Sequence, residues 1–456
     1  MAWFSGLFSG KKRYSQRQMK ELVEVPRPLL KSAAHGGDPR SDSLPRFHGT
    51  ASDQLHRSRG SALERARFRL RSAFTPSQPV RSARMFAGRM EVLKTLIRSI
   101  EDQQLHVILY GDRGIGKTSL LHILAQLARE ARYIVRYGSC GEGVEFTEMF
   151  RAILKDIPLL YHIDYEPTST EIEEGRSLAD LLPDGPLTVT MVSDILAKLA
   201  GTRVLIVLDE FDRAESQTFR RAIAELIKNL SDRSVRVQIV IAGVAANLTE
   251  LIEHIPSIRR NILGLQVPSM NSSEIDELIS NGQEACGLAF EQEAKALIAA
   301  AAYGSPYIAS LLCQNAGLAA VERGANSVAR QDAAQAIHQA VDEIEHRVSS
   351  RSLHYIARAY EDGHANTLGM LARAALHSSG RLLPRQADMV LGEGKGIDYV
   401  SMIGDKYSLT KPIVDDPEGA FQFCEEGVPV YMWMRLAQDK LTAEDYDISA
   451  LDRMAS

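Results

Sequence analysis

The sequence predicts an α/β protein in which a parallel-sheet core is followed by a helical lid and a small α+β module. Between residues 84 and 268, short apolar runs alternate with helical stretches, as in a parallel sheet covered on both faces. From residue 269 the strand-like runs stop and four helical stretches follow. Residues 1–84 hold 17 Lys and Arg against 6 Asp and Glu and lack apolar periodicity, which predicts a mostly disordered basic arm.

A length of 456 residues suits two or three domains. The hydrophobic fraction of 45% and charged fraction of 24% are typical of a soluble globular protein. We expect a basic arm at 1–83, a parallel-sheet core at 84–268, a helical lid at 269–349, a small α+β module at 350–440 and a tail at 441–456.

Several classes of protein are disfavoured by composition. No run of about 18 apolar residues is present, so a transmembrane helix is not expected. The segment "MAWFSGLFSGKKRY" places its charges after the apolar residues, the reverse of a secretory signal. The cysteines are scattered without a CxxC pair, which favours reduced, buried thiols in a cytoplasmic protein and no metal site: Cys140, Cys286, Cys313 and Cys424.

One glycine-rich segment carries the most specific signal. The apolar run "LHVILY" predicts a buried strand, "GDRGIGKT" at 111–118 matches GxxxxGK[ST], and "TSLLHILAQLAREA" continues as a helix. A strand–loop–helix context of this kind is a P-loop, in which backbone N–H groups and the helix N-terminus hold phosphate. The predicted nucleotide-binding residues are Gly111, Asp112, Arg113, Gly114, Ile115, Gly116, Lys117, Thr118 and Ser119.

The cofactors expected at this loop are ATP and Mg²⁺. Lys117 is expected to reach the β- and γ-phosphates, and the Thr118 hydroxyl to hold Mg²⁺. A second buried run, "VLIVL", delivers Asp209 and Glu210 at its C-terminal end, the edge where open α/β sheets bind ligands. Asp209 is predicted to hold Mg²⁺ through water, and Glu210 to orient and deprotonate an attacking water. Glu210 could instead cap a turn.

The other core strands offer weaker candidates. Strands are expected near 105–110, 133–138, 203–208, 236–242 and 262–267, with helices near 84–104, 117–131, 144–156, 189–200 and 215–231. Asn247 follows the fourth strand, where it would contact the γ-phosphate or cap the next helix. For Asp212 two roles stay open: support of the nucleotide site or contact with another subunit. The acidic, turn-rich segment 161–186 predicts a surface insertion.

The C-terminal part predicts a helix-turn-helix followed by a β-hairpin, the winged-helix pattern. Two helices are expected within 366–391 and strand-like runs within 397–412 and 419–438. The expected recognition helix, "PRQADMVLGEG", is not strongly basic, so both DNA and protein contacts stay open. The basic residues expected near it are Arg373, Arg381 and Arg385.

The basic arm has its own alternatives. Clustered Lys and Arg favour nucleic acid or an anionic membrane, and a solvated linker is an equal interpretation. Residues 64–74 could form a short basic helix on contact with a partner. Trp3, Phe4, Leu7 and Phe8 recur at helical spacing before three basic residues, which would suit a weak interfacial membrane contact through residues 1–14.

An ordered series of segments extends the interpretation: "FAGRMEVLKTLI", the P-loop, "VLIVLDEFD", "SIRRNILGLQVP" and "YGSPYIASLL". Over roughly residues 84–345 this series resembles the AAA+ and STAND-type ATPases, in the branch of origin-recognition-like bacterial ATPases. The resemblance implies that Gly88 and Arg89 lie near the adenine. It also implies that Arg259 or Arg260 acts on a neighbouring subunit's nucleotide, and the alternative is a solvated surface.

The resemblance includes one departure. In that branch an arginine often follows the Gly-x-Pro turn of the lid, whereas here Pro306 of this turn, which we expect at the nucleotide, is followed by Tyr307. A slow nucleotide-dependent switch is therefore favoured over fast hydrolysis. The leading hypothesis is a self-associating ATPase acting as a DNA-associated regulator or loader. The alternative is a signalling or scaffold ATPase that acts through protein contact, possibly at a membrane; a small-molecule kinase is disfavoured.

Overall fold

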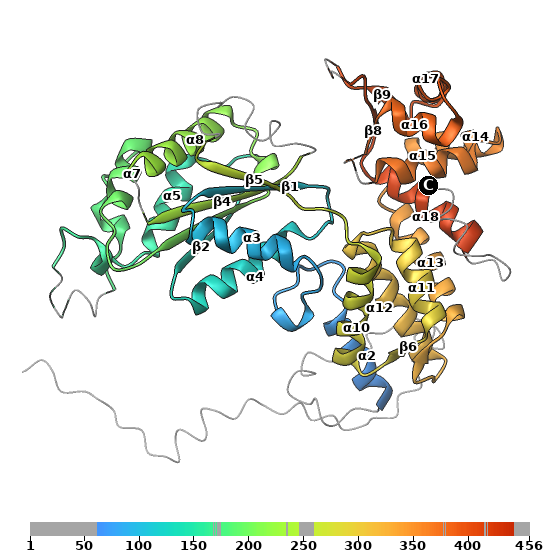
Figure 1. The fold of residues 1–456 in the computed structure, drawn as a ribbon, viewed down its shortest axis with the longest axis horizontal. Helices are drawn as coiled ribbons and strands as arrows, with labels where there is room; N and C mark the ends of the chain where they lie inside the picture. Colours follow the sequence, from blue (N-terminus) through green and yellow to red (C-terminus); the bar gives the residue numbers. More distant parts are fainter. Residues whose placement is uncertain are drawn as a thin grey trace, which may run out of the picture. The chain divides into compact units, whose positions relative to one another are not determined.

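The computed structural model describes the chain from residue 62 to residue 441 with short gaps (Figure 1). The described residues are 62–166, 168, 170, 175–233, 236–245, 260–376, 378, 380–414, 416 and 418–441. The predictions made for residues 1–61, including the contact through 1–14, and for the tail from 442 fall outside them. None of the described helices is long and apolar enough to cross a membrane.

The predicted parallel sheet is confirmed. Its five strands are all parallel and lie in the order β2-β3-β4-β1-β5, with β1 between β4 and β5. The carboxyl ends of β1 and β3 therefore open on the same edge, separated by β4. The strands are β1 (His106–Gly111), β2 (Ile134–Ser139), β3 (Val204–Asp209), β4 (Val237–Val244) and β5 (Ile262–Gln266).

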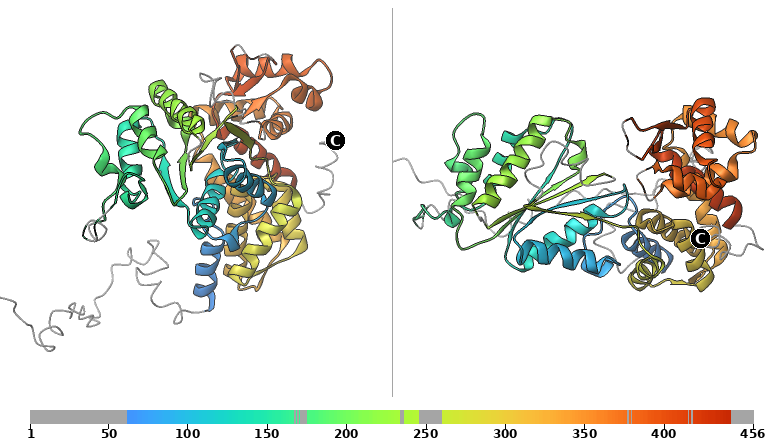
Figure 2. Two further views of the ribbon diagram at one scale, coloured as in Figure 1. Left: turned by 60° about the vertical axis from the view of Figure 1, so that its left-hand side comes forward. Right: turned by 45° about the horizontal axis from the view of Figure 1, so that its top comes forward.

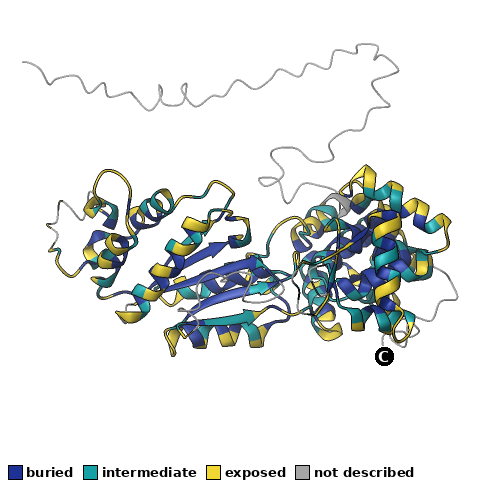
Figure 3. Ribbon diagram, turned by 90° about the horizontal axis from the view of Figure 1, so that it is seen from above, coloured by how far each residue is buried: buried dark blue, intermediate teal, exposed yellow. Residues whose placement is uncertain are grey.

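Helices cover both faces of this sheet (Figure 2, right). Strand β3 shows why: Val204, Ile206 and Leu208 face one apolar core, while Leu205 and Val207 face the other. Figure 3 shows the strands as the buried layer between the helices. One face is covered by α3 (Met90–Glu101) and α4 (Lys117–Glu130), and the other by α5 (Phe146–Lys155), α7 (Val189–Ala197) and α8 (Gln217–Asp232).

The predicted surface insertion at 161–186 is anchored in the core at its ends. Short 3-10 turns, η2 (Leu159–Tyr161) and η3 (Leu178–Leu181), place Leu159 and Leu178 among the buried residues under α5 and α7. A bridge between Pro158 and Ser177 closes the base of the segment. The acidic composition therefore describes only part of the insertion, and its leucines complete the core.

The four predicted lid helices are present, with a two-stranded sheet of β6 (Ala289–Phe290) and β7 (Ser327–Val328). Asn271 caps the first helix and forms a capping box with Glu274. The lid helices are α10 (Ser272–Cys286), α11 (Gln292–Ala302), α12 (Pro306–Glu322) and α13 (Arg330–Glu345).

A helix of the expected basic arm belongs to the lid. Helix α2 (Ala62–Ala73) packs on α10 and α12, with Leu70 and Phe74 each 1% exposed. The Gln314 side chain donates to the Phe74 carbonyl at 2.5 Å. The prediction of a disordered arm extending to residue 83 is therefore wrong from residue 62 onwards, because the apolar side chains of a basic helix are buried in this chain's own lid.

The C-terminal module has the order of a winged helix. A helix, a strand, two helices and two strands follow one another, and the strands form an antiparallel sheet in the order β8-β10-β9. Two further helices flank this unit. The elements are α14 (Ser350–Glu361), α15 (Ala365–Ala375), β8 (Arg381–Leu382), α16 (Pro384–Leu391), α17 (Gly396–Tyr407), β9 (Thr410–Pro412), β10 (Phe421–Phe423) and α18 (Gly427–Leu441).

Two expected strand-like runs are mostly helical. Within 397–412 only β9 is a strand, because the buried side chains of α17, Val400, Ile403 and Tyr407, recur at helical spacing. Within 419–438 the strand β10 is followed by α18, most of whose side chains are buried. The second helix of the motif is thus followed by a third, α17, which takes the position expected for the recognition helix.

Two of the three basic residues expected at a recognition helix are engaged elsewhere. The Arg373 guanidinium is buried over the ring of Tyr303, 4.4 Å from its centroid, and Arg381 forms an ion pair with Asp416 at 2.5 Å. Arg385 is exposed on α16. Helix α17 itself exposes Asp398 and Asp405, so the topology assigns the third position to a helix with exposed carboxylates.

The lid and the C-terminal module share one hydrophobic core. Buried residues of α2, of the lid helices and of α15, α17 and α18 form a single cluster. The Trp433 indole N–H of α18 donates to the Ala301 carbonyl of α11 at 2.9 Å. The buried Arg373 guanidinium of α15 lies over the ring of Tyr303, at the end of α11, and over that of Trp433 of α18, so the two segments pack as one unit.

Candidate nucleotide-binding site

The P-loop connects β1 to α4 as the motif predicts. Gly111, Gly114 and Gly116 have φ angles of 146°, 72° and 95°, a region that residues with a Cβ rarely adopt. Helix α4 begins at Lys117, with Gly116 as its N-cap. The backbone N–H groups of its first turn, which have no partner within the helix, therefore begin at the end of the glycine loop.

Neighbouring backbone and side chains closely surround the glycines of this loop. A Cβ placed on Gly111 would lie 2.8 Å from the Val267 carbonyl oxygen. A Cβ on Gly114 would lie 3.4 Å from the Tyr307 Cβ, and one on Gly116 would lie 3.4 Å from the Arg89 Nη1. The loop is therefore a close-fitting backbone cradle that residues of the lid and of the segment before α3 approach.

Lys117 is a buried cation held by neutral acceptors. Its Nζ donates to the carbonyls of Gly111 and Asp112, at 2.8 Å each. Burial lowers the pKa of Lys117 to about 8, and the nearby Asp212 opposes this effect most strongly. A phosphate at the loop would supply the anionic partner that a desolvated ammonium lacks in this arrangement.

A second buried cation lies beside the loop. Arg89 is 4% exposed, and burial lowers its pKa to about 10. Its Nη2 donates to the Pro268 carbonyl at 2.9 Å, whereas its Nε and Nη1 are buried without a hydrogen-bond partner among the described residues. Nη1 is the atom that lies nearest to Gly116 in the cradle. This orientation fits an anion at the loop.

Carboxylates of the lid hold the backbone of Gly88 and Arg89, just before α3. The Arg89 N–H donates to Glu274 at 2.7 Å, and the Gly88 N–H donates to Glu277 at 3.0 Å. Both carboxylates belong to α10, the first lid helix. Arg89 has a φ of 58°, and these contacts hold a backbone conformation that non-glycine residues seldom adopt.

Asp209 lies at the carboxyl end of β3, 4% exposed. The Tyr137 hydroxyl donates to its Oδ2 at 2.5 Å, and the backbone N–H of Glu210 donates to its Oδ1 at 2.9 Å. A carboxylate accepts about four hydrogen bonds, so acceptor positions remain on both oxygens. Asp209 can therefore accept from water bound to a metal ion without losing these two contacts.

Glu210 follows in a left-handed backbone conformation with a φ of 54°. The Ser139 hydroxyl donates to its Oε2 at 3.0 Å, and Arg213 contacts the same oxygen at 3.3 Å. About half of the Glu210 side chain is exposed. Asp212 accepts from the Val244 N–H at 2.8 Å and so joins the ends of β3 and β4.

The remaining predicted site residues make contacts near the loop, are exposed, or lie outside the described residues. The Ser119 hydroxyl accepts from the Val80 N–H at 3.0 Å, and Arg113 forms an ion pair with Glu426 at 2.7 Å. Pro306 is the first residue of α12, and its Cγ would lie 3.8 Å from a Cβ on Gly116. Arg260 is exposed before β5, whereas the predictions for Asn247 and Arg259 lie outside the described residues.

The sequence analysis missed Tyr137 and Ser139. Both lie on β2, which pairs with β3 so that Ser139 is level with Asp209. Polar residues at the carboxyl end of a second parallel strand were an available signal, since these ends meet at one edge. The contacts of Glu274 and Glu277 carried no such signal, because they depend on how the lid packs.

The residues present fit Mg²⁺ only together with a nucleotide. Among the described residues, no group of three or more His, Cys, Asp and Glu side chains could hold a metal ion. Mg²⁺ characteristically takes one or two protein ligands together with substrate phosphates and water. Thr118, at the start of α4, and Asp209 supply donors of that type at the same sheet edge.

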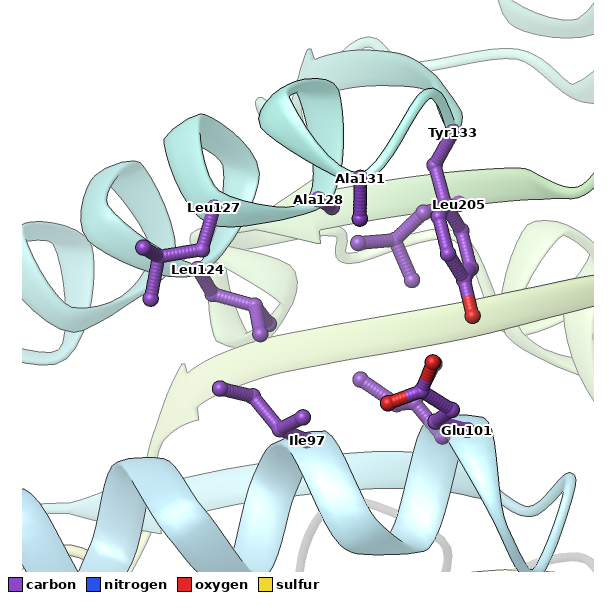
Figure 4. Close-up of a pocket in the computed structure, with 9 residues that line it drawn as sticks. Ile97, Glu101, Leu124, Leu127, Ala128, Ala131, Tyr133 and Leu205 are labelled. Carbon is purple, nitrogen blue, oxygen red and sulfur yellow. The ribbon is translucent and has the colours of Figure 1, made fainter.

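A cavity of about 100 Å³ between α3 and α4 lies at the opposite edge of the sheet (Figure 4). Ile97, Leu124 and Leu127 line its apolar wall, with Glu101 and Tyr133 at one end. Tyr133 and Leu205 belong to the amino ends of β2 and β3. The cavity is therefore separate from the P-loop and is far smaller than a typical ligand pocket of 300 Å³ or more.

Comparison with known proteins identifies the core. Residues 86–241 match the family model of the AAA ATPase domain. A search of curated proteins found no match.

Solved structures with a similar arrangement were also found. They include the Thermotoga maritima RuvB Holliday junction branch migration motor, at 15% identity over 75% of this chain and 95% of that chain, with a TM-score of 0.42. The Aeropyrum pernix Orc1 protein in complex with DNA is 16% identical over 84% of this chain and 98% of that chain, with a TM-score of 0.43. Cdc6p of Pyrobaculum aerophilum is 13% identical over 81% and 98%, with a TM-score of 0.43. These values are too low to carry an inference about function.

Proposed function

We propose that this protein is a slowly hydrolysing ATP switch whose nucleotide state sets the position of the lid and C-terminal module against the ATPase core. The observation that carries the proposal is the glycine cradle of an AAA ATPase domain with two buried cations, Lys117 and Arg89, against it. Buried cations beside a backbone cradle favour a polyanionic ligand, and ATP with Mg²⁺ has that chemistry.

The chain's own residues divide the work of binding. Lys117 would exchange its two carbonyl acceptors for phosphate oxygens, and Arg89 would direct its free Nη1 to the same anion. The Thr118 hydroxyl and the Asp209 carboxylate would hold Mg²⁺, the latter through water. When bound, Mg²⁺ would neutralise part of the charge on the phosphates.

Glu210 is the residue we assign to water activation. Its carboxylate would accept a proton from the attacking water, which requires a free oxygen facing the substrate. Ser139 and Arg213 both contact Oε2 and so hold the side chain at the exposed edge. Both contacts fall on Oε2 and leave Oε1 to accept the proton, but turning the side chain toward the substrate would break them, which supports a slow switch.

The output of the switch would pass through contacts at the outer face of the P-loop. Tyr307 of the lid packs against Gly114, and Glu426, just before α18, pairs with Arg113. The lid and the C-terminal module share one core, so they would move together. A change in the loop on phosphate binding would thus alter contacts with both.

Two substitutions test binding and hydrolysis separately. Lys117→Ala should remove ATP binding, because the cradle loses its central cation. Glu210→Gln should retain ATP binding and stop hydrolysis, because Asp209 is unchanged while the proton acceptor is lost. Isothermal titration with ATP and phosphate release measure the two steps. Undiminished ATP affinity in Lys117→Ala would refute the site, and lost affinity in Glu210→Gln would make Glu210 structural.

The phosphate-release assay also tests self-association. We assign Arg259 or Arg260 to the nucleotide of a neighbouring copy, where an arginine can stabilise charge on the transferring phosphoryl group. Mixing an Ala variant of either arginine with Glu210→Gln should restore part of the hydrolysis, because some interfaces then pair an intact arginine with an intact Glu210. No recovery in demonstrated co-assemblies would exclude a role in trans.

DNA association is the second candidate function. Residues 1–61 hold 11 Lys and Arg against 5 Asp and Glu, a composition that suits phosphate contact. The third helix of the winged-helix-like module, α17, exposes two carboxylates, Asp398 and Asp405, and its Lys406 is paired with Asp362 at 2.8 Å. We therefore place DNA or anionic-lipid contact in the basic segment, and protein contact in the module.

A further inference from the structure

We propose that Tyr137 is a positioning residue that orients the Asp209 carboxylate for Mg²⁺, an inference that rests on the proposed ATP and Mg²⁺ site. Tyr137 lies on β2, which comes between the P-loop and the acidic pair in the sequence. In the sheet, β2 pairs with β3, the strand that ends at Asp209. Neither motif includes it, and its hydroxyl contacts the more buried of the two carboxylates.

The hydroxyl and a backbone amide hold Asp209 from two sides. Tyr137 donates to Oδ2 at 2.5 Å and the Glu210 N–H donates to Oδ1 at 2.9 Å, so each carboxylate oxygen has one fixed donor. Two such contacts leave little freedom for rotation about the bond that carries the carboxylate. The remaining lone pairs then point in set directions, which matters because Mg²⁺ demands a near-ideal octahedral shell.

The tyrosine ring is itself held in place. It stacks on the His122 ring of α4, with centroids 5.0 Å apart and planes 10° from parallel. His122 lies one helical turn beyond Thr118, the other expected metal-binding residue. The ring contact therefore ties the position of the hydroxyl to the helix that follows the P-loop, so both metal-binding residues share one rigid support.

The hydroxyl is a hydrogen-bond donor to Asp209. Loss of a donor to a buried carboxylate removes a charge-assisted hydrogen bond, which typically changes an equilibrium by roughly ten-fold or more. We expect that change to fall on Mg²⁺-dependent binding.

Tyr137→Phe in the full-length protein isolates the hydroxyl, since the ring can still stack on His122. The readout is the affinity for a fluorescent ATP analogue as Mg²⁺ is titrated, with a parallel series in excess EDTA. We expect the Mg²⁺ midpoint to rise about ten-fold while affinity in EDTA stays unchanged. The matched control is Tyr133→Phe, whose hydroxyl accepts from Arg203 at the opposite edge of the sheet and should leave the midpoint unchanged.

The outcomes separate this inference from the proposed function. An unchanged Mg²⁺ midpoint in Tyr137→Phe overturns the positioning role. An equal loss of affinity in Mg²⁺ and in EDTA also overturns it, because the residue would then support the nucleotide site as a whole. If the wild-type protein shows no ATP binding, the proposed function itself fails. His122→Ala should shift the midpoint in the same direction by a smaller factor, since it loosens the ring but keeps the hydroxyl.

Discussion

Phe74→Ala should strongly destabilise the lid, although residue 74 lies in the part of the chain that composition marks as a basic arm. The Phe74 ring is 1% exposed and packs edge-on against Phe290, with centroids 5.8 Å apart. Removing a buried phenylalanine side chain typically costs about 3–5 kcal/mol. A total stability of about 5–15 kcal/mol is usual for a domain, so this loss is a large share of it.

The glycine opposite offers a test of the contact itself. A Cβ on Gly282 would lie 2.1 Å from the Phe74 Cζ, so Gly282→Ala alone should overpack the site and cost about 1–3 kcal/mol. In the Phe74→Ala background the added methyl group enters vacated space instead. The double variant should therefore lose less free energy of unfolding than the sum of the losses in the two single variants.

Urea unfolding and hydrogen exchange of α10 and α12 measure these effects. Arg71→Ala is the matched control, since Arg71 is exposed on the same helix and should change stability by no more than about 0.5 kcal/mol. If Phe74→Ala changes neither the urea midpoint nor the exchange of α10, helix α2 is not part of the lid core. Strictly additive effects of Phe74→Ala and Gly282→Ala would contradict the direct contact.

Two further predictions concern pH and salt. Burial lowers the pKa of His106 to about 4, and its Nδ1 accepts from the Ile239 N–H at 2.9 Å. Because this pKa lies below the unfolded value of about 6.5, the stability that depends on the neutral ring is complete above about pH 6.5 and is lost as pH falls toward 4, by about 2 kcal/mol between pH 7 and 5. Urea midpoints at the two pH values should converge in His106→Leu, and an unchanged pH dependence would rule His106 out. Deleting residues 1–61 should weaken DNA binding and flatten its salt dependence while leaving helix α2 in place; an equal salt slope in both proteins would assign the contact elsewhere.

The parts that the sequence predicted well are those whose chemistry is local. The P-loop is one continuous segment, and its glycines, Lys117 and Thr118 require no knowledge of the fold. Asp209 and Glu210 follow directly from a buried strand and the edge rule of parallel sheets. In each case the side chain's place at the sheet edge follows from its immediate neighbours in the chain, so pattern alone located it.

The misjudged elements depend on contacts between distant segments. Helix α2 has the composition of a solvated arm. Its burial depends on Gly282 and Gly317 of the lid helices, which have no Cβ and so make room for Phe74 and Leu70. The α17 segment contains β-branched and aromatic residues that suit a strand, yet burial of one helical stripe decides its form. The polar end of β2 could be expected at this sheet edge, but the pairing of Tyr137 and Ser139 with Asp209 and Glu210 depends on the strand register, which no local pattern supplies.

With tyrosine rather than arginine at position 307, the positive charges that would face a bound phosphate come from other residues. With Tyr307 packed against Gly114, the cations that line the cradle are Lys117 and Arg89, both from the ATPase core. The backbone of Arg89 is nevertheless held by Glu274 of the lid, with Glu277 holding Gly88 beside it. Rotation of the lid would break both hydrogen bonds and release a left-handed residue from the conformation that aims its guanidinium at the loop. If Arg89 contacts phosphate as proposed, lid position and phosphate affinity would be linked through it, and by the reciprocity of linkage a bound phosphate would favour the lid position in which α10 holds Arg89.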